Sequence, residues 1–318
     1  MTTTVSIEIV SRVSEGRLQK GVGMDFSFQL LEKVKSQLAL YGNPTTKSPV
    51  VLYWGLDALE KVGKLNRGTN YWGFIEPQRS IESLSRLGRG TERYQSFAGW
   101  VVQNPVQKLF LEEFVGISYS RINLLPPCVE NPDLPKSGTE IFQEGQLLLF
   151  SNEGNQENLK GILRNKTGRE VQLLSPKTKN ATELFQQASA LIVWESQRES
   201  YEAASLMLFA MAAGIPVFSP NTFFSQFLLQ DEQEGILYPC GELPVLLSKL
   251  KAYLIKPERL AILGSNAQEK CRSLFGYSAQ TQRILQLLQH PASANSGKAQ
   301  QPLLSLIPSH FDSQPLDD

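Results

Sequence analysis

The segment RESYEAASLMLFAMAAGIPVFSPN, which runs from Arg198 to Asn221, decides the fold. Residues 201–213 carry apolar side chains on every face, which predicts a buried helix rather than an amphipathic one. Gly214 is typical of a helix stop, and the following Pro216-Val217 predicts the start of a short strand. In a doubly wound sheet, the N-terminus of such a helix opens onto the crevice where ligands bind, and its amides favour phosphate. On composition alone, a plain core helix is the alternative.

Short apolar runs alternate with helical stretches along most of the chain. This alternation predicts parallel sheets covered by helices, and hence an α/β fold. A proline-rich, polar connector at residues 130–138 predicts a domain boundary. We therefore expect domains at residues 1–135 and 136–290 and a disordered tail at residues 291–318. The predicted strands are residues 5–10, 50–54, 71–75, 121–127, 146–151, 170–175, 190–195, 215–218 and 235–238. The predicted helices are residues 26–41, 92–115 (interrupted near Asn104-Pro105), 156–165, 182–188, 201–213, 223–229, 243–254, 257–274 and 279–289.

Length and composition limit the class of protein. The 318 residues suffice for two domains, and 31 basic residues balance 31 acidic ones, so nothing global points to nucleic acid. Three widely spaced cysteines argue against a disulfide scaffold or a zinc site and favour a reducing cytosol. We see no signal peptide, and no apolar run reaches the roughly 18 residues needed to span a bilayer. We expect a cytoplasmic protein, and peripheral contact with the inner face of a membrane stays open.

Several segments, in their order and spacing, resemble retaining GT-B glycosyltransferases, especially those of glycosyltransferase family 4. AMAAGIPVFSPN resembles the helix-to-strand signature of that family, and DEQEGILYP resembles the turn that follows it. Weaker likeness extends over residues 102–134 and 190–288. The resemblance implies two Rossmann-like domains whose parallel sheets face a central cleft, with the acceptor on the first domain and the nucleotide-sugar on the second. It also implies that the second domain is short by about one βα unit between residues 146 and 190.

The resemblance further implies a reaction. A hexose would move from a nucleotide-sugar to a polysaccharide, lipid-linked or small-molecule acceptor with retention of configuration. No metal or other cofactor is implied, because the helix dipole and basic side chains stabilise the leaving diphosphate. The residues that the resemblance places at the site are Glu199 and Lys160 for catalysis, Ser200 and Tyr201 at the helix start, and Gly21 and Gly23 in the first-domain loop KGVGMDF. Asn221 and Thr222 are candidates from their position alone, at the carboxyl end of the next predicted strand.

The sequence departs from the family where the donor should be held. The family carries two glutamates eight positions apart, and an ungapped alignment places Tyr201 and Phe209 there. A two-residue bulge would let Glu199 replace the first glutamate, whereas a capping box with Ser196 would make Glu199 a helix cap. Nothing nearby replaces the second glutamate.

The basic and histidine positions depart as well. Lys160 has no arginine partner in register, and Arg164 and Lys166 further along are more typical of solvated helix charges. The only histidines are His290 and His310, in or beside the tail, so histidine chemistry in the cleft is excluded.

Two functions therefore stay open at the level of the sequence. One is an active glycosyltransferase, and the other is a catalytically silent relative that serves as a binding or scaffold protein. Aromatic residues in the first half could stack on sugars, although core packing is their more frequent use. These residues are Tyr53, Trp54, Tyr71, Trp72 and Trp100. An apolar island at residues 303–307 is either a docking motif or an unremarkable part of the tail.

Overall fold

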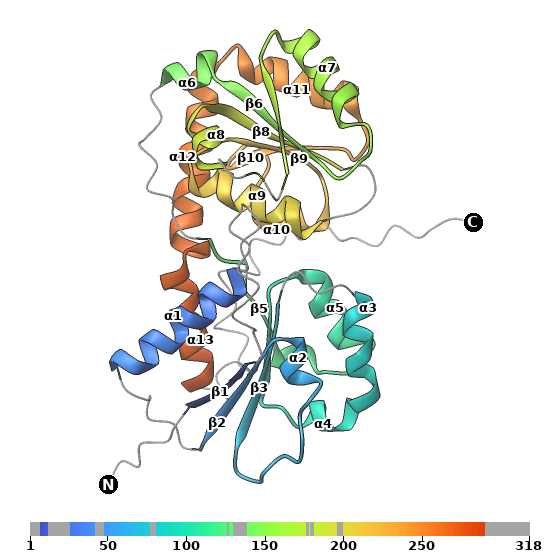
Figure 1. Ribbon diagram of the computed structural model, residues 1–318, viewed down its shortest axis with the longest axis vertical. Coiled ribbons are helices and arrows are strands. Elements are labelled where there is room, and N and C mark those ends of the chain that lie inside the picture. The colour runs from blue at the N-terminus through green and yellow to red at the C-terminus, as the bar shows by residue number, and fades with distance from the viewer. Residues whose placement is uncertain are drawn as a thin grey trace, which may run out of the picture.

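The chain forms two parallel five-stranded sheets, one in each of two lobes (Figure 1). The structure, a computed structural model, describes residues 7–11, 26–41, 48–76, 81–125, 127–129, 139–175, 178, 181–195 and 200–289. The first sheet contains β1 (Ile7–Ser11), β2 (Val50–Trp54), β3 (Asn70–Ile75), β4 (Gly99–Val102) and β5 (Ile122–Leu124). The second contains β6 (Gln146–Ser151), β7 (Val171–Leu174), β8 (Ala188–Trp194), β9 (Val217–Pro220) and β10 (Gly235–Tyr238). The predicted α/β architecture is confirmed.

Helices cover both sheets and follow the strands in sequence. In the first lobe they are α1 (Phe26–Tyr41), α2 (Leu56–Leu59), α3 (Ile81–Leu84), α4 (Thr91–Gln95) and α5 (Pro105–Glu113). In the second half of the chain they are α6 (Thr139–Glu144), α7 (Gln156–Thr167), α8 (Ala181–Gln186), α9 (Tyr201–Ala212), α10 (Phe223–Leu228), α11 (Leu243–Leu254), α12 (Pro257–Lys270) and α13 (Tyr277–Gln289). The sequence did not predict the short helices α2, α3 and α6, because single turns of helix carry too little periodicity to recognise.

The two sheets differ in strand order. The first runs β1-β2-β3-β4-β5, so each described strand lies beside its predecessor in the chain. The second runs β10-β9-β8-β6-β7, so the chain goes outward from β6 to β7 and returns to the other side of β6 with β8. This reversal is a topological switch point, and such points are where open α/β sheets bind ligands.

The helix stop predicted at Gly214 is present. Helix α9 ends at Ala212, and Gly214 follows with a positive φ of 74°. Its amide donates to the Met211 carbonyl at 3.0 Å, and the Ile215 amide donates to the Ala210 carbonyl at 2.8 Å. Glycine at this position satisfies the last helical carbonyls without the steric cost that a side chain would carry. The chain can therefore turn directly into β9.

One prediction about the first lobe was wrong. Residues 99–102 form strand β4, although the sequence predicted a mainly helical segment over residues 92–115. The strand pairs with β3 so that Trp72 lies opposite Gly99 and Gly73 lies opposite Trp100. Glycine is a poor strand former because it has no side chain to pack. In β4 the Trp72 ring of the neighbouring strand packs over Gly99 instead. That partner is not visible in the local sequence.

Aromatic side chains form much of the first core. Trp54, Trp72 and Trp100 are almost completely buried, and Tyr71 is 6% exposed. The Tyr53 side chain is half-buried, and its ring stacks on that of Tyr71 with centroids 6.3 Å apart. Core packing, the more frequent use of such residues, therefore accounts for the four buried rings.

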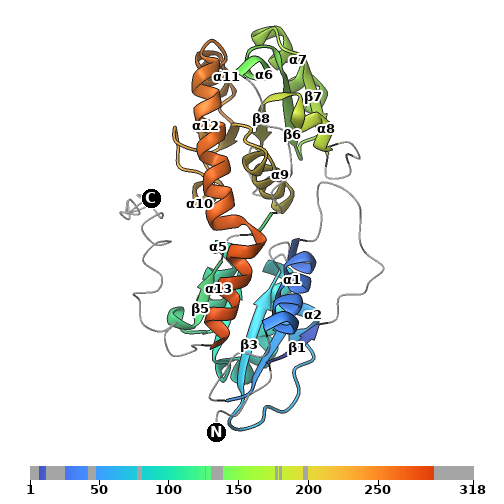
Figure 2. The ribbon, with the colours of Figure 1, turned by 90° about the vertical axis from the view of Figure 1, so that its left-hand side faces the viewer.

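The C-terminal helix joins the second lobe to the first. Helices α12 and α13 follow one another along one side of both lobes (Figure 2), and α13 packs against α1. Between them residues Cys271–Phe275 form a π-helical turn. The Val129 amide donates to the Phe275 carbonyl at 2.9 Å, which ties the chain after β5 to this turn.

The predicted boundary at residues 130–138 and the predicted tail lie outside the described residues, so the domain limits stay predictions.

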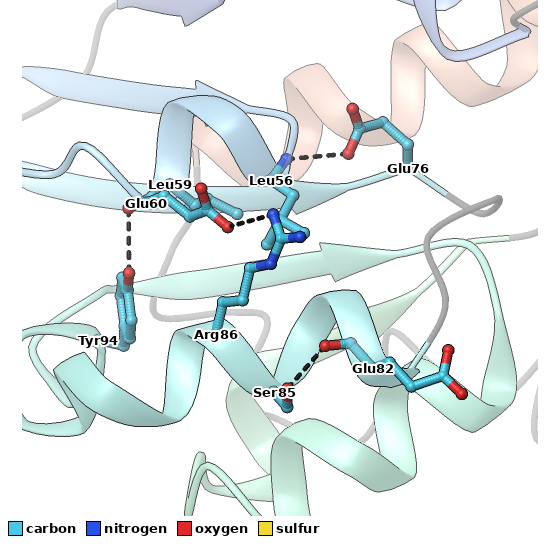
Figure 3. A network of polar contacts seen from close by, with 8 residues as sticks. All are labelled: Leu56, Leu59, Glu60, Glu76, Glu82, Ser85, Arg86 and Tyr94. Carbon is cyan, nitrogen blue, oxygen red and sulfur yellow. Dashed lines mark hydrogen bonds and ion pairs between the residues drawn. The ribbon is translucent and has the colours of Figure 1, made fainter.

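A buried glutamate orders the carboxyl end of the first sheet (Figure 3). Glu76 directly follows β3, and its Oε2 accepts a hydrogen bond from the Leu56 amide at 2.9 Å. Leu56 is the first residue of α2. At the other end of α2, the Tyr94 hydroxyl donates to the Leu59 carbonyl at 3.0 Å. These two contacts hold α2 between β3 and α4.

Candidate functional site

The switch point of the second sheet lies between β6 and β8. Both strands are buried, and their carboxyl ends lie side by side because Ser151 and Trp194 are partners in register. The residues that follow are polar: Asn152 and Glu153 after β6, and Glu195 after β8. The fold therefore gathers polar side chains at the place where an α/β sheet binds its ligands.

Glu195 is the centre of this group. It is only 6% exposed. Its Oε1 accepts a hydrogen bond from Asn152 Nδ2 at 3.1 Å and another from the Ser200 hydroxyl at 2.5 Å. Burial of a carboxylate is costly unless hydrogen bonds compensate it, and these two donors come from opposite sides of the switch point. The carboxylate thus joins the ends of β6 and β8 to the start of α9.

Ser200 is the N-cap of α9. Its Oγ accepts from the Ala203 amide at 3.1 Å, which satisfies one of the amides that the helix leaves unpaired. Because α9 begins at Tyr201, a capping box of Ser196 with Glu199 would lie one turn too early for this helix. Glu199 itself lies outside the described residues.

A second carboxylate and two rings lie beside Glu195. Glu153 Oε2 accepts from Trp194 Nε1 at 3.1 Å, and the Trp194 ring stacks on Tyr238 with centroids 6.2 Å apart. The Tyr238 hydroxyl donates to the Val193 carbonyl. Burial raises the pKa of this hydroxyl well above its ordinary value, and the nearby Cys240, Glu195 and Glu153 raise it further. The ends of β6, β8 and β10 therefore share one electrostatic environment.

The residues after β9 are fixed by hydrogen bonds to one another and to the end of β10. The Asn221 amide donates to the Tyr238 carbonyl at 2.6 Å, and Asn221 Oδ1 accepts from Gln226 Nε2 at 2.7 Å. Thr222 is the N-cap of α10 and forms a capping box with Ser225. Asn221 is exposed and Thr222 is half-buried, at the same edge of the sheet as Glu195.

Lys160 lies on the second turn of α7. Its Nζ is 4.0 Å from Glu157 Oε2, a contact along one face of the helix. Further along, Arg164 pairs with Glu170 at 3.2 Å, and both side chains are exposed, which suits the predicted solvated charge. Helix α7 begins just after the end of β6, so the helix that carries Lys160 starts near the switch point.

The remaining predicted residues are placed only in part. Gly21 and Gly23 lie outside the described residues, and Tyr201 is the first residue of α9. Phe209 is half-buried, and its ring centroid is 4.9 Å from that of Phe185. Where the resemblance expects a second glutamate, the chain therefore has an aromatic packing contact.

Sequence reasoning missed Glu195 and Asn152. Asn152 directly follows the strand predicted at residues 146–151, and Glu195 is the last residue of the strand predicted at residues 190–195, after the apolar run ALIVW. These positions were the available signal. What the sequence did not show is that the two strands are neighbours, because β7 intervenes between them along the chain.

The described residues offer neither a metal-binding cluster nor a membrane-spanning helix. They contain no group of three or more His, Cys, Asp or Glu side chains that could hold a metal ion. Their helices include none that is long and apolar enough to cross a membrane.

Comparison with known proteins rests on structure. The sequence matches no protein-family model and no curated protein sequence. Among solved structures, HepE from Anabaena in complex with UDP-glucose superposes with a TM-score of 0.58 at 11% identity, over 89% of this chain and 98% of that chain. The fold is that of the GT-B glycosyltransferases.

Two further solved GT-B structures show the same likeness. Sucrose-phosphate synthase from Thermosynechococcus elongatus matches with a TM-score of 0.52 at 14% identity, over 89% of this chain and 81% of that chain. A TarM variant from S. aureus in complex with fondaparinux, α-GlcNAc-glycerol and UDP matches with a TM-score of 0.55 at 12% identity, over 82% of this chain. The match spans only 58% of the TarM chain, so this protein corresponds to little more than half of that relative.

Proposed function

We propose that the protein transfers a hexose from a nucleotide-sugar to a polysaccharide, lipid-linked or small-molecule acceptor, with retention of configuration. The observation that carries the proposal is the polar cluster at the switch point of the second sheet, in a GT-B fold. Glu195, Asn152 and Ser200 meet there beside the start of α9. HepE structures with this fold contain UDP or UDP-glucose.

The donor would bind at the carboxyl edge of the second sheet. The first amides of α9, next to Ser200 and Tyr201, favour a phosphate group because of their orientation and the helix dipole. Asn221 and Thr222 border the same sheet edge, and Glu199 directly precedes Ser200 in the sequence. Lys160 would supply positive charge to the leaving diphosphate, and Gly21 and Gly23 would let the first-domain loop approach the reacting sugar across the cleft. We propose that no metal is needed, so that EDTA leaves the transfer rate unchanged.

The proposal includes a cytoplasmic location, with contact at the inner face of a membrane if the acceptor is lipid-linked. Cys128, Cys240 and Cys271 all lie in the described part of the chain and none is joined in a disulfide there, which suits a reducing compartment.

Isothermal titration with UDP, GDP and ADP tests the donor site. We expect one of the three to bind, and Glu199→Ala to weaken that binding about tenfold if Glu199 contacts the nucleotide-sugar. Glu258→Ala is the matched control, because Glu258 is an exposed glutamate in the first turn of α12, away from the proposed site, and is expected to leave the affinity within about twofold. Absence of binding by all three nucleotides at millimolar concentration would sink the proposal.

A second candidate is a catalytically silent binding or scaffold protein. The specific observation in its favour is the contact between Phe209 and Phe185, which fills with aromatic rings the position where the resemblance expects a carboxylate. The two candidates differ in turnover. Release of nucleoside diphosphate from UDP-glucose, GDP-mannose or ADP-glucose, with a mixture of oligosaccharide acceptors, supports the enzyme. Tight nucleotide binding without such release supports the silent protein.

A further inference from the structure

We propose that Glu195 is the positioning residue of the donor site and acts on bound nucleotide through Ser200. The inference rests on the proposed function, since it assigns a role within that same site. Glu195 was not among the residues that the family resemblance placed there. Its position after β8, at the switch point, is fixed by the strand order of the second sheet.

The first step of the argument is convergence. A single carboxylate oxygen, Glu195 Oε1, accepts from Asn152 Nδ2 at 3.1 Å and from Ser200 Oγ at 2.5 Å. Asn152 belongs to the end of β6, Ser200 to the start of α9, and Glu195 to the end of β8. This one oxygen therefore restrains three chain segments at once.

The second step concerns the hydroxyl proton of Ser200. A serine hydroxyl has one proton to donate and lone pairs with which to accept. Because the proton is directed to Glu195, the lone pairs are left to face the Ala203 amide, 3.1 Å away. The carboxylate therefore fixes the direction of the cap. Without the carboxylate, the hydroxyl is free to rotate and the first turn of α9 loses its orientation.

The third step connects the cap to the ligand. Ser200 occupies the amide of Ala203, while helix geometry leaves the amides before it, those of Tyr201 and Glu202, without partners inside the helix. Those are the amides that the proposed function offers to a phosphate group. Glu195 is 6% exposed and bonds to Ser200, which is half-buried, so in this proposal Glu195 orients these amides rather than contacting the nucleotide.

The experiment compares four variants: Glu195→Gln, Glu195→Ala, Ser200→Ala and the double variant Glu195→Ala with Ser200→Ala. The probe is whichever of UDP, GDP or ADP binds the parent protein, titrated below the unfolding temperature of every variant. Glutamine keeps an Oε1 acceptor for both donors, so Glu195→Gln should stay within about threefold of the parent affinity. Glu195→Ala and Ser200→Ala should each lose about tenfold. The double variant should lose no more than either single one, because both act through one contact chain.

Asn152→Ala is the matched control for that coupling. It removes the other donor to the same oxygen and leaves the contact of Glu195 with Ser200 in place, so it should lose less affinity than Glu195→Ala does. Additive losses for Glu195→Ala and Ser200→Ala would overturn the inference. An equal loss in Glu195→Gln and Glu195→Ala would also overturn it, because the charge would then contact the ligand directly.

A second measurement needs no nucleotide. Hydrogen exchange at the start of α9 should be about tenfold faster in Glu195→Ala than in the parent, and unchanged in Glu195→Gln, because the cap on Ala203 depends on the acceptor. Unchanged exchange in Glu195→Ala would overturn the inference by itself. The parent protein could show the expected exchange and yet bind no nucleotide. That result would refute the proposed function and overturn the role of Glu195 in binding. The ordering of α9 by Glu195 would still stand.

Discussion

Trp72 of β3 lies directly over Gly99 of β4, its partner in register. A Cβ atom placed on Gly99 would come within 2.3 Å of the Trp72 ring. The neighbouring pair repeats the arrangement in reverse, because a Cβ on Gly73 would come within 2.6 Å of the Trp100 ring. Each indole thus occupies the space that the glycine of the other strand leaves empty, and the two strands fit together only in this register.

Gly99→Ala should destabilise the protein by about 3 kcal/mol, because the fully buried Trp72 ring has no room to move away. The measurement is the free energy of unfolding in urea. Gly63→Ala is the control, since Gly63 has no atom within 4 Å of its would-be Cβ and should change stability by less than about 1 kcal/mol. Equal effects for the two variants would show that Trp72 and Gly99 are not packed in this way.

Gly55→Ala should also destabilise the protein, for a different reason. Gly55 has φ 94° and ψ 154°, a region that side chains avoid, and its would-be Cβ lies 2.7 Å from Glu76 Oε1. We expect a loss of about 3 kcal/mol from backbone strain and displacement of Glu76 together. Gly68→Ala has a positive φ of 80° but open space around it, so it should show the backbone strain alone, about 1 kcal/mol. Thermal unfolding of both variants separates the backbone strain from the displacement of Glu76. A loss of stability in Gly68→Ala as large as that in Gly55→Ala would count against the contact with Glu76.

The three thiols should differ in reactivity. Cys240 is exposed, whereas Cys128 and Cys271 are buried and burial raises the pKa of both thiols. Only the thiolate attacks an aromatic disulfide reagent, so the native protein should release colour for Cys240 alone. In concentrated guanidinium chloride all three should react. Cys240→Ala should abolish the fast native reaction, and persistence of that reaction in the variant would place an accessible thiol elsewhere.

Stability should fall as the solution becomes alkaline. The folded pKa values of Cys128 and Cys271 are raised, so both stay protonated in the fold at a pH where the unfolded chain ionises them. Their contribution is complete below the unfolded pKa of about 8.5 and is lost as pH rises above it, by up to about 1.4 kcal/mol per pH unit for each thiol. Urea titrations from about pH 8, just below the thiol pKa of the unfolded chain, to about pH 10 measure the slope. Cys271→Ala should reduce that slope and Cys240→Ala should not, so identical slopes in both variants would contradict the burial of Cys271.

Helices and strands that are marked by a local sequence pattern can be predicted from the amino-acid sequence. The run at residues 50–54 and the helix at residues 26–41 have the predicted bounds, because wholly apolar runs and helical periodicity need no partner to be recognised. Strand β4 was missed because its first residue, Gly99, is a poor strand former by itself, and the Trp72 ring that packs over it belongs to another strand. The site shows the same division. The start of α9 was predicted from the helix pattern, and Ser200 was named from the family resemblance, but Glu195 was predicted from neither.

What the sequence by itself determined is the succession of strands and helices, the buried character of α9 and the glycine stop at Gly214. These follow from residue type and spacing along a continuous stretch of chain. Only the tertiary structure decided that β6 and β8 are neighbours, with β7 on the outside. That strand order brings Asn152 to within 3.1 Å of Glu195, 43 residues further along the chain, and makes the segment from Arg198 to Asn221 one side of a polar site. Pairing between distant strands depends on packing across the whole sheet, and no local pattern carries it.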